Sequence, residues 1–239
     1  MTSTTASTIP TTGDRPARKR RWGRRILIGL TAVVVLLVAS VVLYVKLAPV
    51  PAPLALPATP ANTPAGALEG TWDVAEGSEV GFRIQQTVLF VTGDVVQRTR
   101  AVTGALTVTG NQITAADFRV DLTTITSNGQ VTPQLALSLD TEHHPQATIT
   151  LTQPITLDPA FTVGGTATAT AAGRLTLRGI SRPVTVTIAA RRDGDDLSAA
   201  GSFPATFAEW NIPSPTGYGP LGDLADHGTA EFLLILRHR

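Results

Sequence analysis

A period-two alternation of apolar and polar residues is the feature that most restricts the fold of this chain. It recurs in segment after segment between residues 80 and 236, for example as ATATAAGRLTL over residues 167–177. Such alternation places apolar side chains on one face of a strand and polar side chains on the other, as half-buried antiparallel sheets require. The alternating segments lie at residues 80–85, 102–108, 118–122, 148–152, 166–178, 184–188, 197–203 and 232–236. The sequence therefore predicts an all-β, antiparallel domain.

Eight or more such strands must avoid long exposed edges, and a closed barrel and a two-sheet sandwich both achieve this. Turn residues such as Gly110-Asn111 and Asp193-Gly194 separate the segments, which agrees with hairpin connections. One stretch, residues 133–140, is rich in leucine and alanine and predicts a short helix, although its leucine spacing is ambiguous. The alternation alone leaves barrel and sandwich open.

The predicted apolar face contains unusually many small residues. These are Gly104, Ala167, Ala169, Ala171, Gly173, Ala199 and Gly201. Because protein interiors are normally filled, small inward residues favour a barrel that holds a ligand. Tight sheet packing is the alternative, as is a coding bias that the seventeen arginines against two lysines would indicate. The composition leaves a ligand cavity and a filled core equally open.

An uncharged run of twenty residues, 26–45, precedes the β domain. At 1.5 Å per residue it matches the ~30 Å hydrocarbon core of a bilayer, so we expect a transmembrane helix over residues 26–47. Residues 1–25 carry a net charge of +6, which predicts a cytoplasmic N-terminus and an extracytoplasmic remainder. A buried core helix and a cleavable signal peptide are the competing interpretations. A nucleic-acid-binding arm is disfavoured because an apolar span begins at the next residue.

Four parts of the chain follow from these features. We expect residues 1–25 to form a disordered basic cytoplasmic tail and residues 26–47 to form the single membrane span of a cell-membrane protein. Residues 48–67 contain six prolines and no charge, which predicts an extended, semi-rigid spacer that leaves the orientation of the next domain free. Residues 68–239 form the β domain.

No motif indicates catalysis or metal binding. The chain has no cysteine, and its four histidines are not at metal-ligand spacing. It contains no Gly-x-Ser-x-Gly elbow, no HExxH motif and no phosphate-binding glycine loop. We therefore expect a protein that is not an enzyme, with no metal ion and no nucleic-acid partner; the sequence identifies no protein partner.

Three segments resemble the YceI-like family of lipid-binding, lipocalin-like β-barrels. They are the opening strands GTWDV (70–74) and SEVGF (78–82), the helix-to-strand passage LDTEHHPQATI (139–149), and the family's Gly-x-Leu-Thr signature as GRLTLRGISRPV (173–184). The resemblance covers residues 68–237. His144 and Ile149 replace residues that are usually aromatic in the family, and Trp210-Asn211-Ile212 departs from its late aromatic-Gly motif.

The resemblance implies a barrel of about eight strands with a short helix, whose lumen binds an isoprenoid lipid of the quinone or polyprenyl type. It implies no covalent chemistry and no cofactor other than such a lipid. The expected function is a membrane-anchored, extracytoplasmic carrier in the bacterial cell envelope; the alternative is an interaction or scaffolding domain with a filled barrel. The expected lining residues are Val80, Phe82, Ile84, Val102, Leu106, Phe118, Val120, Ile149, Ala169, Ala171, Leu175, Leu177, Val184 and Val186.

Overall fold

The computed structural model describes residues 18–47, 50–58, 66–89, 91–127, 129–213 and 222–239, and within the first helix it describes the side chains of residues 27–43 and 47. The chain divides into two units, residues 1–47 and residues 48–239. Among its described residues the first unit contains one helix, α1 (Arg18–Leu47), which includes residues 18–25 of the tail expected to be disordered. Residues 1–17 of that tail lie outside the described residues. In the described part of the chain, no helix combines the length and the apolarity needed to cross a bilayer. The membrane span expected at residues 26–47 is not confirmed and stays a prediction.

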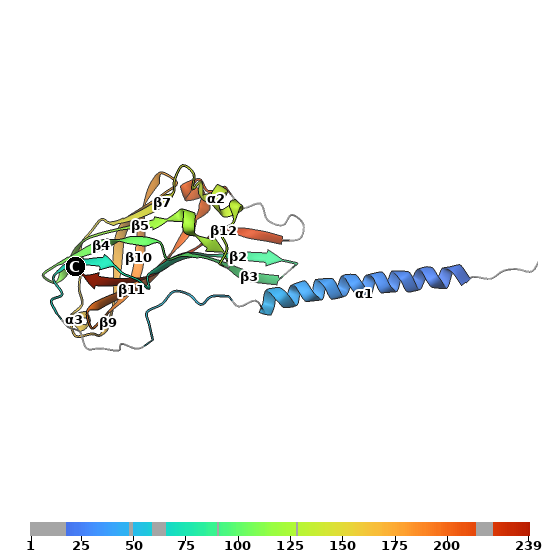
Figure 1. Cartoon of the computed structure of the whole chain (residues 1–239), viewed down its shortest axis with the longest axis horizontal. Helices are drawn as coiled ribbons and strands as arrows, with labels where there is room; N and C mark the ends of the chain where they lie inside the picture. The colour runs from blue at the N-terminus through green and yellow to red at the C-terminus, as the bar shows by residue number, and fades with distance from the viewer. Residues whose placement is uncertain (1–17, 48–49, 59–65, 90, 128, 214–221) are drawn as a thin grey trace, which may run out of the picture. The chain divides into compact units, whose positions relative to one another are not determined.

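Eight strands of the second unit form a closed antiparallel barrel (Figure 1). The order around the barrel is β1 (Gly70–Val74), β4 (Val102–Thr109), β5 (Gln112–Asp121), β7 (Gln146–Leu151), β9 (Thr166–Leu177), β10 (Ile180–Asp193), β11 (Asp196–Thr206) and β12 (Gly222–His238). β12 closes the barrel by pairing with β1, with Trp72 opposite His238 and Val74 opposite Leu236. The expected antiparallel barrel of about eight strands is confirmed.

Four further strands extend this sheet. β2 (Glu79–Val88) pairs with the first two thirds of β12, and β3 (Val91–Thr99) pairs with β2. The two-residue strands β6 (Thr126–Ser127) and β8 (Ile155–Thr156) pair with β3 and β5. The seventeen residues of β12 therefore border β2 with one part and β1 with the other.

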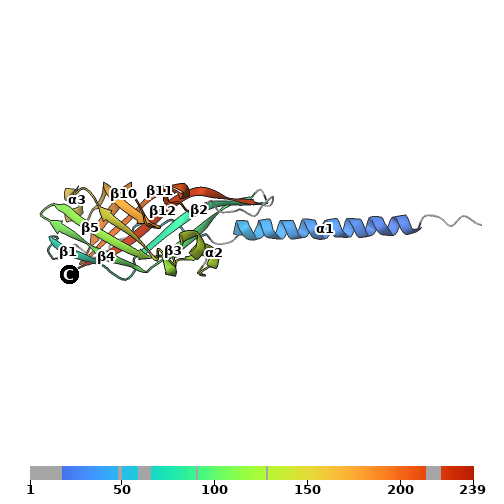
Figure 2. The same cartoon turned by 90° about the horizontal axis from the view of Figure 1, so that it is seen from above.

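Short helices lie at both ends of the barrel (Figure 2). They are η1 (Leu122–Thr124), α2 (Pro133–Leu139), α3 (Pro159–Thr162) and η2 (Phe207–Trp210). Thr132 caps the start of α2 because its hydroxyl accepts a hydrogen bond from Leu135 N, and Pro133 occupies the first helical position. This confirms the predicted short helix. α2 and α3 lie at opposite ends of the barrel, which we call the α2 end and the α3 end.

A cluster of buried core residues lies at the α3 end. Trp72, Val108 and Leu236 are almost fully buried there, together with Phe161 of α3. The indole N–H of Trp72 donates to Leu68 O at 2.9 Å, so the only polar group of this side chain is satisfied. Because Trp72 lies on β1 and Leu236 on β12, this packing also secures the pair of strands that closes the barrel.

The proline-rich segment at residues 50–58 lies against the outer face of the barrel. The guanidinium group of Arg83 donates to Pro51 O at 2.8 Å, and that of Arg98 donates to Ala52 O. The Glu231 carboxylate accepts a hydrogen bond from Leu54 N and lies 2.9 Å from Arg98 Nη2. The segment is extended, as expected of the spacer at residues 48–67, but residues 51–54 contact the barrel, which the expectation of a free orientation did not include. Residues 48–49 and 59–65 of the expected spacer lie outside the described residues. We call residues 50–58 the strap.

Candidate functional site

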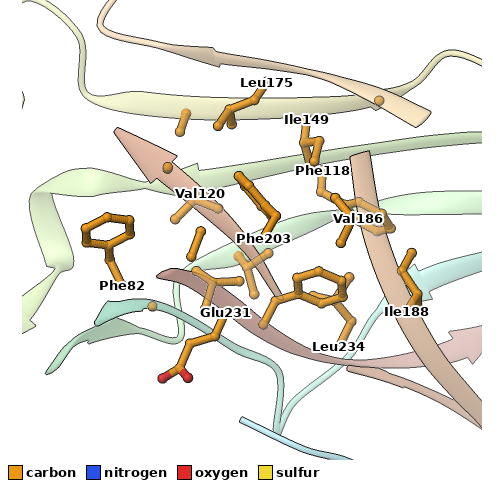
Figure 3. A pocket seen from close by; sticks show the side chains of 18 of the residues that line it. Phe82, Phe118, Val120, Ile149, Leu175, Val186, Ile188, Phe203, Glu231 and Leu234 are labelled. Atoms are coloured by element: carbon orange, nitrogen blue, oxygen red, sulfur yellow. The ribbon is translucent and has the colours of Figure 1, made fainter. Parts of the chain in front are cut away.

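A cavity of about 700 Å³ occupies the interior of the barrel. This volume lies within the range of roughly 300–1,000 Å³ that is typical of small-molecule sites. Its lining comes from the inner faces of β2, β4, β5, β7 and β9–β12, and from α2, α3 and η2. Figure 3 shows apolar side chains, among them Phe118, Val186 and Leu234, converging from different strands. The alternation of the strands produces this interior, because every second residue points inward.

The cavity is lined by thirteen of the fourteen residues expected from the sequence. They are Val80, Phe82, Ile84, Val102, Leu106, Phe118, Val120, Ile149, Ala169, Ala171, Leu175, Leu177 and Val186. Val184 is not part of the lining, although it shares a strand face with Val186; it is two residues nearer the start of β10. The structure thus brings the expected residues together, and their contact with a ligand stays a prediction.

The small inward residues divide into two groups. Ala167, Ala169, Ala171, Gly173 and Ala199 line the cavity. At Gly104 and Gly201, atoms of neighbouring residues occupy the space that a side chain would need. A Cβ at Gly104 would clash with the carbonyl oxygen of Asp117, and one at Gly201 would lie 2.7 Å from Phe232 Cζ. Cavity formation and tight packing, left as alternatives by the composition, both occur, at different positions.

Sequence reasoning missed the lining residues that come from short helices. Leu135 and Leu139 of α2, Phe161 of α3, and Phe207 and Trp210 of η2 all line the cavity. In η2 the signal was present, because a 3₁₀ helix has three residues per turn and places residues i and i+3 on the same face. An aromatic pair three residues apart therefore points one way, but four residues are too few to show a period.

The lining contains little titratable chemistry. Among the described residues, only Asp158 and Glu231 contribute carboxylates, and no lysine, arginine or histidine lines the cavity. Asp158 caps α3 by accepting a hydrogen bond from Ala160 N at 2.7 Å. Figure 3 shows the Glu231 carboxylate turned away from the apolar side chains. The carboxylate contacts Arg98 and accepts a hydrogen bond from Leu54 N of the strap. The arrangement suits an apolar ligand better than acid–base chemistry.

No group of three or more potential metal ligands was found among the described residues. Two of the four histidines, His143 and His144, follow α2. His143 Nδ1 lies 2.7 Å from Asp140 Oδ1, so this ring has a structural partner. The expectation of no metal ion stays a prediction.

The His143–Asp140 pair at the α2 end should be visible in a titration. The hydrogen bond to Asp140 raises the pKa of His143 above its ordinary value of 6.5 and lowers the pKa of Asp140. The stabilisation from protonated His143 is therefore fully present below pH 6.5 and is lost as the pH rises through the raised pKa. At the acid side it is lost as the pH falls through the lowered pKa of Asp140.

An NMR titration of the His143 ring checks this. Asp140→Asn removes the charge and should return the pKa of His143 towards its ordinary value. If the His143 titration is the same in both proteins, the pair does not form in solution. The pair is exposed, so we expect a change in titration with little change in stability.

Comparison with known proteins agrees with the barrel fold. The model of the YceI-like domain family matches residues 72–230. A solved polyisoprenoid binding domain from Saccharophagus degradans, implicated in plant cell wall breakdown, is similar with a TM-score of 0.55 and 15% identity, over 72% of this chain and 99% of that one. Burkholderia cenocepacia BcnA is similar with a TM-score of 0.52 and 15% identity, over 68% and 98%. No curated protein matches the chain at a significant level.

Proposed function

Because this chain belongs to the YceI-like domain family, we propose that its barrel binds an isoprenoid lipid of the quinone or polyprenyl type and sequesters or carries it. The observation that carries the proposal is the apolar cavity of about 700 Å³. Burial contributes about 0.8 kcal/mol for each CH₂ group, so an isoprene unit contributes a few kcal/mol before the costs of binding. A lumen without polar anchors along most of its length can therefore hold a polyisoprenoid chain.

The family likeness supports a binding protein in preference to an enzyme. One solved structure that shares this fold is described as a polyisoprenoid binding domain. At 15% identity that likeness concerns the fold alone. The ligand proposed for this chain is therefore argued from the residues that line its own cavity. Those residues supply apolar surface and no pair of carboxylates free for acid–base work among the described positions.

We further propose that the protein is a single-pass membrane protein with a cytoplasmic N-terminus and an extracytoplasmic barrel. The uncharged run at residues 26–45 and the basic residues before it support this placement. An anchor keeps a lipid carrier beside the bilayer that supplies its ligand.

The first test is the identity of whatever co-purifies with the chain. Full-length protein is purified, its bound lipids are extracted with organic solvent, and the extract is analysed by mass spectrometry. We expect isoprenoid lipids in a ratio approaching one per barrel. A barrel that is empty and also takes up neither quinones nor polyprenols would contradict the proposal, and co-purification of a specific protein instead would favour the scaffolding alternative.

A further inference from the structure

One polar atom in the lining of the cavity has no partner. Trp210 is 3% exposed and lines the cavity, and its indole Nε1 is buried with no hydrogen-bond acceptor among the described residues. A buried N–H group without an acceptor is costly, and buried tryptophans usually satisfy this group. Trp72 shows the ordinary arrangement, because its Nε1 donates to Leu68 O.

The helix η2 determines on which face Trp210 lies. η2 is 3₁₀-helical, so Phe207 and Trp210 lie on the same face. Phe207 packs against Phe82 of β2 with ring centroids 5.6 Å apart, and both residues line the cavity. The face that carries Trp210 is therefore the face directed at the lumen.

Hydrogen bonds from outside hold η2 in this position. Arg182 Nε donates to Glu209 O at 2.6 Å, and Arg178 donates to Asn211 O. At the start of the helix, Thr206 N donates to a carboxylate oxygen of Glu209. The two arginine contacts fix the backbone on either side of Trp210, and the Trp210 side chain is 3% exposed. A donor held in this way is pre-organised for a ligand.

The charge of the lining restricts what that ligand can be. The described lining contains no cationic side chain that could neutralise a phosphate or a carboxylate. An anionic head group drawn into such a lumen would lose its hydration without a counter-charge. An uncharged oxygen, such as a carbonyl, needs only a donor, and Trp210 offers one.

We propose that Trp210 Nε1 donates a hydrogen bond to an uncharged acceptor oxygen on the head of the isoprenoid ligand, and so selects neutral oxygenated lipids over phosphorylated isoprenoids and pure hydrocarbons. This rests on the proposed binding function of the lumen. Trp210 lies in the segment that departs from the family's usual late motif, so the donor is a property of this chain's own residues. The acceptor end of the ligand then lies beside η2, and the isoprenoid tail extends along the cavity towards α3.

The test compares Trp210→Phe with the unaltered full-length chain in titrations with three probes, read by native mass spectrometry. The probes are a geranylgeranyl-substituted benzoquinone, the hydrocarbon squalene and geranylgeranyl phosphate. Phenylalanine keeps an aromatic ring and removes the N–H group. We expect quinone affinity to fall about tenfold and squalene affinity to change by less than about twofold, with the phosphate binding weakly to both proteins.

Trp72→Phe is the matched control, because it removes an indole N–H that a backbone carbonyl already satisfies. It should leave the ratio of quinone to squalene affinity unchanged. Equal losses of quinone and squalene affinity in Trp210→Phe would overturn the proposal and assign Trp210 to packing. Tight binding of geranylgeranyl phosphate would overturn the requirement for a neutral head. If the unaltered chain binds none of the probes, the binding function itself has failed.

Discussion

Replacing Ala169 with phenylalanine is expected to abolish uptake of an isoprenoid lipid while the barrel still folds. Ala169 lines the cavity from β9, opposite Ile188 of β10. An inward benzyl group would occupy space that the lipid needs. Excluding one isoprene unit removes about 3 kcal/mol of apolar burial, which corresponds to a loss of affinity of at least about a hundredfold. Ala171→Phe, one inward position further along the strand, should act in the same way.

The barrel should tolerate this change because the new side chain enters a cavity. Overpacking a filled core typically costs about 1–3 kcal/mol, and free volume at this site lowers that cost. Thr170→Phe is the matched control, since it adds the same group on the exposed face of the same strand. Lipid binding and thermal unfolding are measured for both variants. Unchanged lipid uptake by Ala169→Phe, in a folded protein, would show that this part of the lumen does not hold the ligand.

The inner face of the barrel could be predicted because period-two alternation is a local property. A residue such as Ala169 or Phe118 points inward once its strand is recognised, whatever the partner strand is. Alternation does not show how far along the lumen a residue of the strand lies. Val184 alternates correctly with Val186 yet does not line the cavity, because periodicity gives the face of a residue and not its position along the lumen.

Features that depend on distant contacts could not be read from the sequence. β3 lacks a clear alternation, and Val91–Thr99 becomes a strand because β2 pairs with it on one edge. Gly104 and Ala169 are both small residues on the inward face of a strand. Only the close approach of the Asp117 carbonyl oxygen shows that Gly104 leaves no room for a side chain. The role of Trp210 likewise depends on η2 being held by arginines from a neighbouring hairpin.

The contacts of the strap could not be predicted from the sequence either, although its extended conformation was predicted. Proline-rich composition predicts an extended chain, and an extended chain leaves its carbonyl groups without internal hydrogen bonds. Whether these carbonyls face water or a partner is decided by the barrel. Here Arg83, Arg98 and Arg191 donate to them, and Leu54 and Leu56, two residues apart, are half-buried.

Removing residues 1–58 should destabilise the barrel, whereas removing residues 1–47 should not. The shorter truncation leaves the strap in place, and the longer one removes the acceptors of three arginines and the Leu54 N–H that donates to Glu231. Hydrogen bonds to charged groups contribute about 1.5–3 kcal/mol each, and part of this sum offsets the ordering of the strap. We expect a net loss of about 3 kcal/mol, or roughly 6–12 °C in melting temperature for a domain of this size.

Glu231→Gln then distinguishes the strap contacts from a general effect of truncation. In the 1–47 truncation this variant weakens the bond to Leu54 N and the ion pair with Arg98, so we expect a measurable loss of stability. In the 1–58 truncation the Leu54 bond is already absent and the carboxylate is less buried, so the same substitution should cost less. Equal effects in the two backgrounds would show that Glu231 and the strap act independently. Non-additive effects, read from urea unfolding of all four proteins, would show that the strap is part of the folded domain.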